Sequence, residues 1–305
     1  MKLAENLRII DGWSIQEDHF REEHLITNGS NFMTGNGYLG YRGTFAEWRA
    51  PQYTGCFVSD TYDKADDTWE ELCNAPNGLY GAFSADGQPL AVLNGTAMGY
   101  HRSLWYRYGL QSRSITLRTP SKAHVTLTEE RFASYASQHL LPARYRIESD
   151  RPAGVELTWG IDGEVWDLNG THLGRHKARS EGENLISVTA RTVTSKLTLA
   201  VASGLRVTSA ETRAETARVG SRLRRSRAAV ASADNKCIFG KLKFTVEPER
   251  PAVVEQYMAV YSSNDLHDPR AAAISAVSTA QEHGYDRLWR EHRRVWDAVW
   301  QDCDI

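Results

Sequence analysis

Four carboxylates form an acidic cluster in the stretch DKADDTWEEL: Asp66, Asp67, Glu70 and Glu71. A pair of carboxylates can act as general acid and general base in the cleavage of a glycosidic bond. Charged residues that are neighbours in sequence on a polar turn more often form a solvated surface. We therefore expect this cluster to be a hydrated face and not a catalytic pair.

The stretch GNGYLGYRG contains glycines at four positions: Gly35, Gly37, Gly40 and Gly43. The first three satisfy G-x-G-x-x-G, which binds dinucleotides when a strand precedes it and a helix begins at its last glycine. The residues after Gly43 show no sustained helical period. Since Asn-Gly is a strong two-residue hairpin signal, the stretch is predicted to be a strand, a tight turn and a second strand.

Other patterns of catalytic or metal-binding residues are missing from the sequence. No serine lies in a nucleophile elbow, and no Gly-Lys-Ser/Thr follows a glycine loop. The scattered histidines lack the i, i+4 spacing of helical metal ligands; they are His19, His24, His101, His124, His139 and His172. The cysteines are far apart and are expected to be reduced thiols; they are Cys56, Cys73, Cys237 and Cys303. We therefore predict no catalytic residue, no metal and no cofactor in this chain.

The net charge of the chain is close to zero, so its surface has no strong overall electrostatic potential. The chain has 305 residues, of which 41% are hydrophobic and 24% are charged, and its formal net charge is −2. We therefore expect neither nucleic acid nor an anionic membrane as a partner. No apolar stretch approaches a membrane span, and the N-terminus lacks a signal-peptide core, so we expect a cytoplasmic protein. The basic run at 221–227, SRLRRSR, is interpreted as an edge or loop that resists sheet association.

Short alternating segments separated by turn signals dominate the chain up to residue 266. The stretch VELTWGID places four apolar side chains on one face, as a half-buried strand does: Val155, Leu157, Trp159 and Ile161. KLTLAVAS, CIFGKLKFTV and AVVEQYMAVYSS repeat this period. Many such strands joined by short turns predict an antiparallel sandwich, so we expect residues 1–266 to form one β domain.

Residues 267–305 are predicted to be helical. A first helix begins near Pro269, and Gly284 separates it from a second, amphipathic helix. Three tryptophans share one side of the second helix: Trp289, Trp296 and Trp300. Since so much aromatic surface normally packs on another body, we expect this helix to dock on a part of the protein beyond Ile305. The alternative is a helix folded back on the sandwich.

Five ordered stretches resemble the N-terminal region of glycoside hydrolase family 65 enzymes. They are GNGYLGYRG, YTGCFVSDTYDKADDTWEELCNAPN, RFASYASQHLLPARYRIES, LTWGIDGEVWDLNGTHL and WDAVWQDCDI. The family includes maltose, trehalose, kojibiose and nigerose phosphorylases and acid trehalases. Five matches in order across nearly the whole chain are more specific than any one of them. Two positions depart from the family pattern: Cys73 replaces the usual valine, and Gly78 stands where an aromatic residue is common.

The resemblance implies a fold, an activity and partners. Family members carry an N-terminal supersandwich of the galactose mutarotase type, a linker helix, an (α/α)6 catalytic barrel and a small β domain. The chain is thus expected to be a non-catalytic domain that binds carbohydrate and supports the barrel of the same polypeptide. The whole enzyme would cleave α-glucosidic disaccharides with inversion, by phosphorolysis or by hydrolysis. Inorganic phosphate is then a further partner, and a homodimer is compatible with these expectations.

The long segment Tyr53–Asn77 is the candidate carbohydrate-binding element. It is polar and aromatic without a clear secondary-structure pattern, and loops of this length tend to be functional. By resemblance it faces the barrel and helps to wall the substrate pocket. The substrate-binding residues expected there are Tyr62, Asp63, Lys64 and Asn74. The alternative is an ordinary surface loop.

Two other functions stay open because fold alone does not fix function. A stand-alone carbohydrate-binding sandwich would need exposed coplanar aromatic residues. An aldose epimerase-like enzyme would need a histidine and a carboxylate that converge in a groove of the sandwich.

Overall fold

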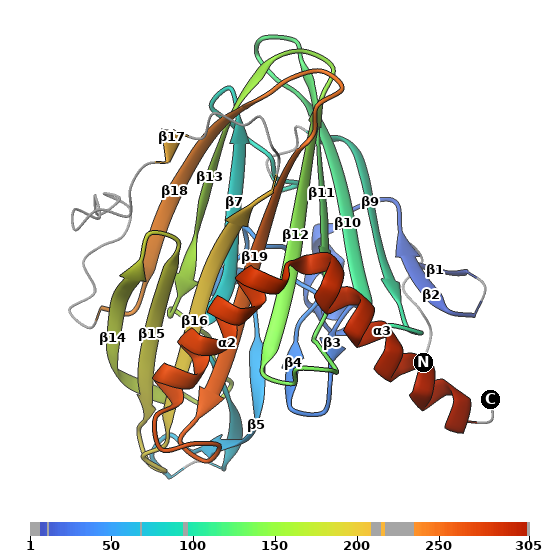
Figure 1. Ribbon diagram of the computed structural model, residues 1–305. Helices are drawn as coiled ribbons and strands as arrows, with labels where there is room; N and C mark the ends of the chain where they lie inside the picture. The colour runs from blue at the N-terminus through green and yellow to red at the C-terminus, as the bar shows by residue number, and fades with distance from the viewer. Residues whose placement is uncertain are drawn as a thin grey trace.

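The computed structural model describes residues 7–10, 12–67, 69–93, 97–208, 215–216 and 235–303. Within these residues the chain forms three antiparallel sheets followed by two long helices (Figure 1). The predicted antiparallel sandwich is therefore confirmed. The basic run at 221–227 lies outside the described residues.

The largest sheet has ten strands within the described residues: β1 (Leu7–Ile10), β2 (Ser14–Glu17), β9 (Ala97–Trp105), β10 (Leu110–Arg118), β11 (His124–Arg131), β12 (Leu140–Ser149), β14 (Leu173–Gly182), β15 (Leu185–Thr192), β16 (Thr198–Val207) and β19 (Ala252–Ser262). Their order is β1-β2-β9-β10-β11-β12-β19-β16-β15-β14. Most neighbours are consecutive in sequence, as short antiparallel connections require. The last strand, β19, inserts between β12 and β16 and so joins the two halves of the sheet.

A second sheet packs against the first and has five described strands: β7 (Asn77–Ala85), β8 (Gln88–Pro89), β13 (Ala153–Asp162), β17 (Glu215–Thr216) and β18 (Ile238–Val246). Their order is β17-β18-β13-β7-β8. Side chains at every second position of β13 enter the core: Val155, Leu157, Trp159 and Ile161 are all buried. The alternation in VELTWGID therefore predicts both the strand and its buried face correctly.

The third sheet contains the glycine-rich stretch. Its four strands, in order, are β3 (Thr34–Gly35), β4 (Leu39–Tyr41), β5 (Cys56–Asp63) and β6 (Glu71–Asn74). The predicted strand, turn and strand is confirmed, because Gly35 pairs with Gly40 across the turn. Gly37 has a φ of 86°, which a residue without a Cβ adopts readily. The side-chain oxygen of Asn36 accepts the N–H groups of Tyr38 and Leu39 and holds the turn closed.

The segment Tyr53–Asn77 differs from the expectation of a loop. The structure forms a hairpin here, β5 followed by β6, so that part of the prediction is wrong. The strand pattern is concealed because Asp60 has a φ of 59° and the pairing of β5 with β6 is irregular between Phe57 and Tyr62. An irregular strand with polar residues on its buried side does not show a period of two.

Buried arginines line the inner side of β9, β10 and β11. Arg102 donates to Glu17 at 2.6 Å, and its guanidinium lies 3.9 Å from the ring centroid of Phe32. Arg113 and Arg131 share the carboxylate of Glu129, each at 3.1 Å. Arg102 also donates to the carbonyl of Gly43 and Arg131 to that of Thr44, so buried charges attach residues 43–44 to the sheet.

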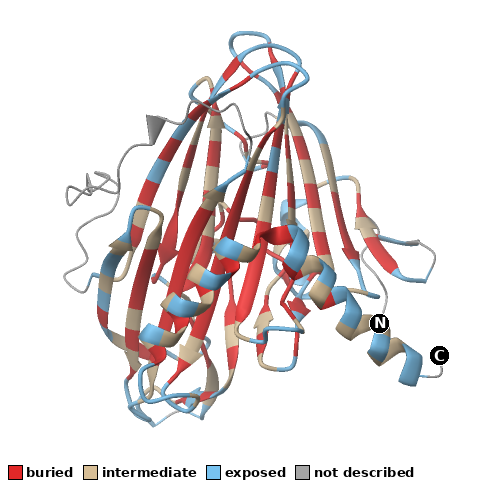
Figure 2. Cartoon of the chain, in the orientation of Figure 1, coloured by how far each residue is buried: buried red, intermediate tan, exposed pale blue. Residues whose placement is uncertain are grey.

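Two long helices follow the sandwich: α2 (Pro269–His283) and α3 (Tyr285–Asp302). A shorter helix, α1 (Leu25–Asn31), and two single turns, Glu22–His24 and Ala50–Gln52, precede β3 and β5. Asp268 caps α2 by accepting the N–H of Ala271 at 3.0 Å. Gly284 separates the helices, as predicted, at a φ of 76°. Figure 2 shows exposed residues along the outward side of both helices.

The helix α3 packs on the sandwich through its aromatic residues. Trp289 contacts Phe132 with ring centroids 5.2 Å apart, and Trp296 contacts Tyr135 at 5.1 Å. Trp300 donates its indole N–H to the carbonyl of Arg107 at 2.6 Å. All three tryptophans are half-buried. The alternative of a helix folded back on the sandwich therefore describes the structure. Docking of the half-exposed rings on a part of the protein beyond Ile305 stays a prediction.

Candidate functional site

Three segments meet around the tip of the β5–β6 hairpin: the hairpin itself, the loop 163–172 and the turn 192–196. The tip lies at the lower end of the molecule in Figure 1, beneath the β-sandwich. Hydrogen bonds from both neighbouring segments reach the hairpin. The hairpin carries all four predicted substrate-binding residues: Tyr62, Asp63 and Lys64 lie beside the tip, and Asn74 lies at its other end, where it pairs with Phe57.

Asp63 is buried at the base of the tip and holds the turn 192–196. Its carboxylate accepts the backbone N–H groups of Val193 at 3.0 Å, Thr194 at 3.0 Å and Ser195 at 2.6 Å. Burial alone would raise the pKa of this carboxyl, but the three N–H donors outweigh it and lower the pKa. Asp63 is therefore an ionised anchor whose acceptor positions are used within the chain.

Asn74 has a similar internal role at the other end of the hairpin. Its side-chain oxygen accepts the N–H of Cys56 at 2.9 Å. Its side-chain nitrogen donates to the carbonyls of Thr54 at 3.1 Å and Trp166 at 3.0 Å. Each polar atom of the amide thus has a partner, and Asn74 joins β5, β6 and the loop 163–172.

Tyr62 and Lys64 are the two predicted residues that reach the surface. The side chain of Tyr62 is 51% exposed, and Lys64 is half-buried. Lys64 also fixes the backbone, since its carbonyl accepts the hydroxyl of Thr194 at 2.8 Å. The structure thus brings the four residues to one region, with two directed into the protein and two at its surface.

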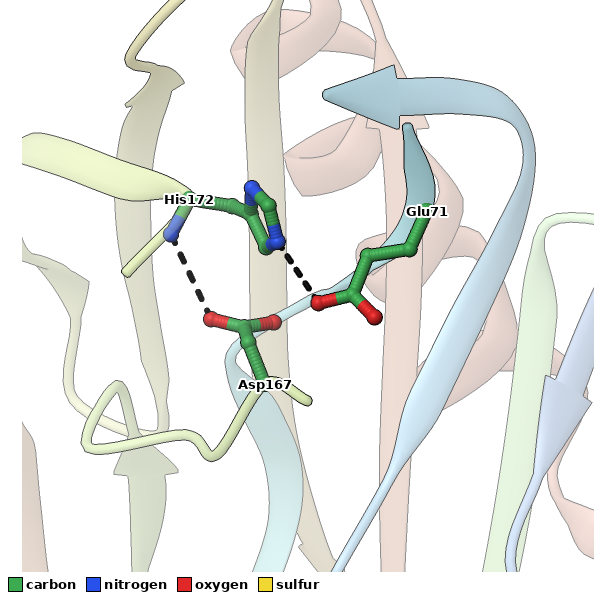
Figure 3. Close-up of side chains that lie close together, drawn as sticks. All are labelled: Glu71, Asp167 and His172. Atoms are coloured by element: carbon green, nitrogen blue, oxygen red, sulfur yellow. Dashed lines mark hydrogen bonds and ion pairs between the residues drawn. The ribbon is translucent and has the colours of Figure 1, made fainter. Parts of the chain in front are cut away.

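Next to them lies a group that the sequence patterns miss: Glu71, Asp167 and His172 (Figure 3). His172 is completely buried, and its Nε2 lies 2.7 Å from the carboxylate of Glu71. Its backbone N–H donates to Asp167 at 3.4 Å. Glu71 and His172 are 101 positions apart. No local spacing could reveal them, and the only sequence signal is that both lie in stretches resembling the family.

The same carboxylate oxygen of Glu71 accepts two further donors, the N–H groups of Leu168 at 3.0 Å and Asn169 at 3.2 Å. Asp167 accepts the N–H of Asn74 at 3.3 Å, and burial raises its pKa. One imidazole and two carboxylates can bind a divalent metal ion in principle. Here Nε2 of His172, one oxygen of Glu71 and both oxygens of Asp167 already make hydrogen bonds that join the hairpin to the loop 163–172, so we interpret the group as an internal polar cluster. The absence of a metal site stays a prediction.

The exposed part of the tip is acidic and aromatic. Asp66, Asp67 and Glu70 are exposed, as a solvated face requires, whereas the expectation of a solvated face is wrong for Glu71. It is wrong because the loop 163–172 folds over this one carboxylate. An epimerase-like site would also need a reachable histidine beside a carboxylate, and His172 is fully buried. This cluster therefore does not supply such a site.

The described residues form a mainly antiparallel β-sandwich followed by two helices. The chain belongs to glycosyl hydrolase family 65: residues 15–299 match the model of that family's N-terminal domain. No helix within the described residues is long and apolar enough to span a membrane.

Relatives and a solved structure agree with this assignment. Over its full length the chain is 34% identical to 1,2-alpha-glucosylglycerol phosphorylase of Bacillus selenitireducens, of which it covers 37%. Over 96% of its length it is 28% identical to nigerose phosphorylase of Lachnoclostridium phytofermentans, of which it covers 40%. A structure described as "Putative kojibiose phosphorylase from human microbiome" aligns over 97% of this chain and 39% of its own, with a TM-score of 0.79 and 18% identity, which supports the fold. The chain thus spans about two fifths of these proteins.

Proposed function

We propose that this chain is the non-catalytic N-terminal domain of a cytoplasmic phosphorylase that cleaves α-glucosides with inversion. The observation that carries the proposal is the 34% identity to a glucosylglycerol phosphorylase along the entire chain. Residues 1–266 form the supersandwich domain, and residues 267–305 link it to an (α/α)6 barrel. In the barrel an acid protonates the leaving sugar while phosphate attacks the opposite face of the glucosyl ring.

The domain contributes to substrate binding through the β5–β6 hairpin. Tyr62 and Lys64 contact the sugar, since their side chains reach the surface at the tip. Asp63 and Asn74 position that tip through hydrogen bonds within the chain. This division of roles is supported by chemistry: a carboxylate that already accepts three N–H groups has little capacity left for a sugar hydroxyl.

The chain alone is expected to be catalytically silent, whereas the full-length protein is expected to be active. Both would be incubated with 1,2-α-glucosylglycerol, nigerose, kojibiose, trehalose and maltose, with and without phosphate. Released glucose and glucose 1-phosphate are measured, and proton NMR assigns the anomer. Phosphate-dependent release of the β-anomer by the full-length protein alone supports the proposal. Turnover by the chain alone, or hydrolysis without phosphate by the full-length protein, contradicts it.

Tyr62→Ala and Lys64→Ala in the full-length enzyme are expected to raise KM for the glucoside roughly three- to tenfold, with smaller changes in kcat. A contact that binds substrate and transition state equally lowers KM, so its loss raises KM and changes kcat little. Asp60→Asn is the matched control, because Asp60 is an exposed residue of the same strand. Initial rates at varied glucoside concentration measure the effect. Wild-type KM values in both variants would remove these residues from the binding site.

A further inference from the structure

Trp69 is the most exposed aromatic side chain of the described residues, at 67% exposure. It lies at the tip of the hairpin, two positions before Glu71. Leu168, which is 77% exposed, belongs to the loop bonded to the same tip. A single exposed aromatic residue is common on protein surfaces and does not by itself indicate a binding site. Trp69 differs because side chains from a distant loop hydrogen-bond to the backbone of its hairpin tip.

The tip is fixed by the residues that we call the tip latch: Glu71, Asp167, Asn169 and His172. Asn169 donates its side-chain N–H to the carbonyl of Trp69 at 2.8 Å. The carboxylate of Glu71 receives the backbone N–H groups of Leu168 and Asn169 and faces Nε2 of His172 at 2.7 Å. Hairpin tips are ordinarily the least restrained part of a sheet. Here three half-buried polar side chains and the buried His172 restrain the backbone that carries the exposed indole, and preorganised binding residues are supported in this way.

The surroundings of Trp69 indicate the chemistry of its ligand. Asp66, Asp67 and Glu70 are exposed carboxylates in the same tip. They accept hydrogen bonds from hydroxyl groups and repel phosphate and other anions. A protein surface that covered Trp69 would also desolvate these three charges, at high cost unless each found a partner. A neutral polyhydroxylated ring, with C–H groups for the indole face and hydroxyls for the carboxylates, meets both requirements.

We propose that Trp69 is a sugar-stacking residue that contacts a pyranose or polyol part of the substrate, and that the tip latch positions it. The inference rests on the proposed function. It adds a ligand-contacting residue, and it places the phosphate outside the subsite formed by Trp69 and the exposed carboxylates. Trp69 is the contact, and His172 and Asn169 are positioning residues that act through it.

Calorimetric titration of the full-length protein with the glucosides named above, without phosphate, tests this contact whether or not turnover occurs. Trp69→Ala is expected to weaken sugar binding roughly tenfold, Trp69→Phe to retain most of it, and Trp105→Ala to leave it unchanged. Trp105 is the control because it is a 50% exposed tryptophan at the end of β9, outside the tip. In the active enzyme KM for phosphate should stay at its wild-type value in Trp69→Ala.

The role of the tip latch is tested by asking whether the effects of latch and Trp69 substitutions on sugar binding add up. His172→Gln and Asn169→Ala should each weaken sugar binding severalfold, and combining Asn169→Ala with Trp69→Ala should be no worse than Trp69→Ala alone. Wild-type sugar affinity in Trp69→Ala overturns the inference even if the enzyme is a phosphorylase. Tryptophan-dependent sugar binding without any phosphorolysis would retain the inference and overturn the proposed function. Failure of the wild-type protein to bind any of these glucosides overturns the inference as well.

Discussion

Replacing Glu129 by leucine is expected to lower the free energy of unfolding by about 3–5 kcal/mol, the range found when one partner of a buried ion pair is removed. Glu129 is 4% exposed and lies between Arg113 and Arg131, whose side chains are 2% and 1% exposed. Arg113 would still have a carboxylate partner, because Glu47 accepts hydrogen bonds from both of its terminal nitrogens at 2.7 and 2.8 Å. Arg131 loses its only carboxylate partner among the described residues and becomes an uncompensated buried charge.

Urea unfolding of the chain, followed by circular dichroism, measures this effect, and the neighbouring residue provides the control. Glu130 is bonded to Arg144 at the surface, so Glu130→Leu should cost no more than about 1 kcal/mol. In Glu129→Leu with Arg131→Met, the loss should be smaller than the sum of the single losses by roughly 1–3 kcal/mol. Equal, small losses for Glu129→Leu and Glu130→Leu would mean that the buried charges contribute little to stability.

This network also shows where sequence reasoning about the fold reaches its limit. The buried side of β10 is formed by Gln111, Arg113, Ile115 and Leu117. Alternation identifies strands whose inner side is apolar, such as β13, and it assigns charged positions to solvent. The inner side of β10 is half polar because Glu47, from the segment at residues 43–47, supplies a carboxylate to Arg113. That pairing joins residues 66 positions apart and leaves no local pattern.

The resemblance directs attention to Tyr53–Asn77, and the structure places the four expected residues in one hairpin, although their role in substrate binding stays a prediction. The contacts of these side chains could not be predicted from the sequence. Whether a polar side chain faces a ligand or its own chain depends on what lies opposite. Asp63 faces the N–H groups of residues 193–195, which fold onto it from another sheet. The latch partner His172 is likewise supplied by a distant loop.

The stability of the chain is expected to fall by about 3 kcal/mol between pH 6.5 and pH 4 through the single residue His292. This histidine is 1% exposed beneath α3. Its Nδ1 accepts the backbone N–H of Tyr135 at 2.9 Å, and its Nε2 lies 2.7 Å from the carbonyl of Tyr108, to which the neutral ring donates. Burial lowers the pKa of His292 to about 4, from an ordinary value of 6.5. The neutral ring is thus part of the attachment of α3.

The sign of the effect follows from proton uptake. Between pH 6.5 and pH 4 the unfolded chain protonates His292 and the folded chain does not, so stability decreases as the pH falls. Above pH 6.5 both states are neutral and this contribution is constant. About 2.5 pH units at 1.36 kcal/mol each give the expected change. Because α3 is attached through this ring, release of the helix is the expected first event, and the N–H of Tyr135 should lose protection from hydrogen exchange.

Urea unfolding at pH 7.5, 5.5 and 4.5 measures this in the wild-type chain and in His292→Gln, which keeps a side-chain N–H donor but cannot titrate. The variant is expected to be less stable than the wild type at pH 7.5, and the difference should shrink steadily as the pH falls. Trp296→Phe, which alters the contact of α3 with Tyr135 and removes no titratable group, should keep the wild-type pH dependence. A difference between the wild type and His292→Gln that is constant with pH would show that the ring's neutrality does not hold α3 in place.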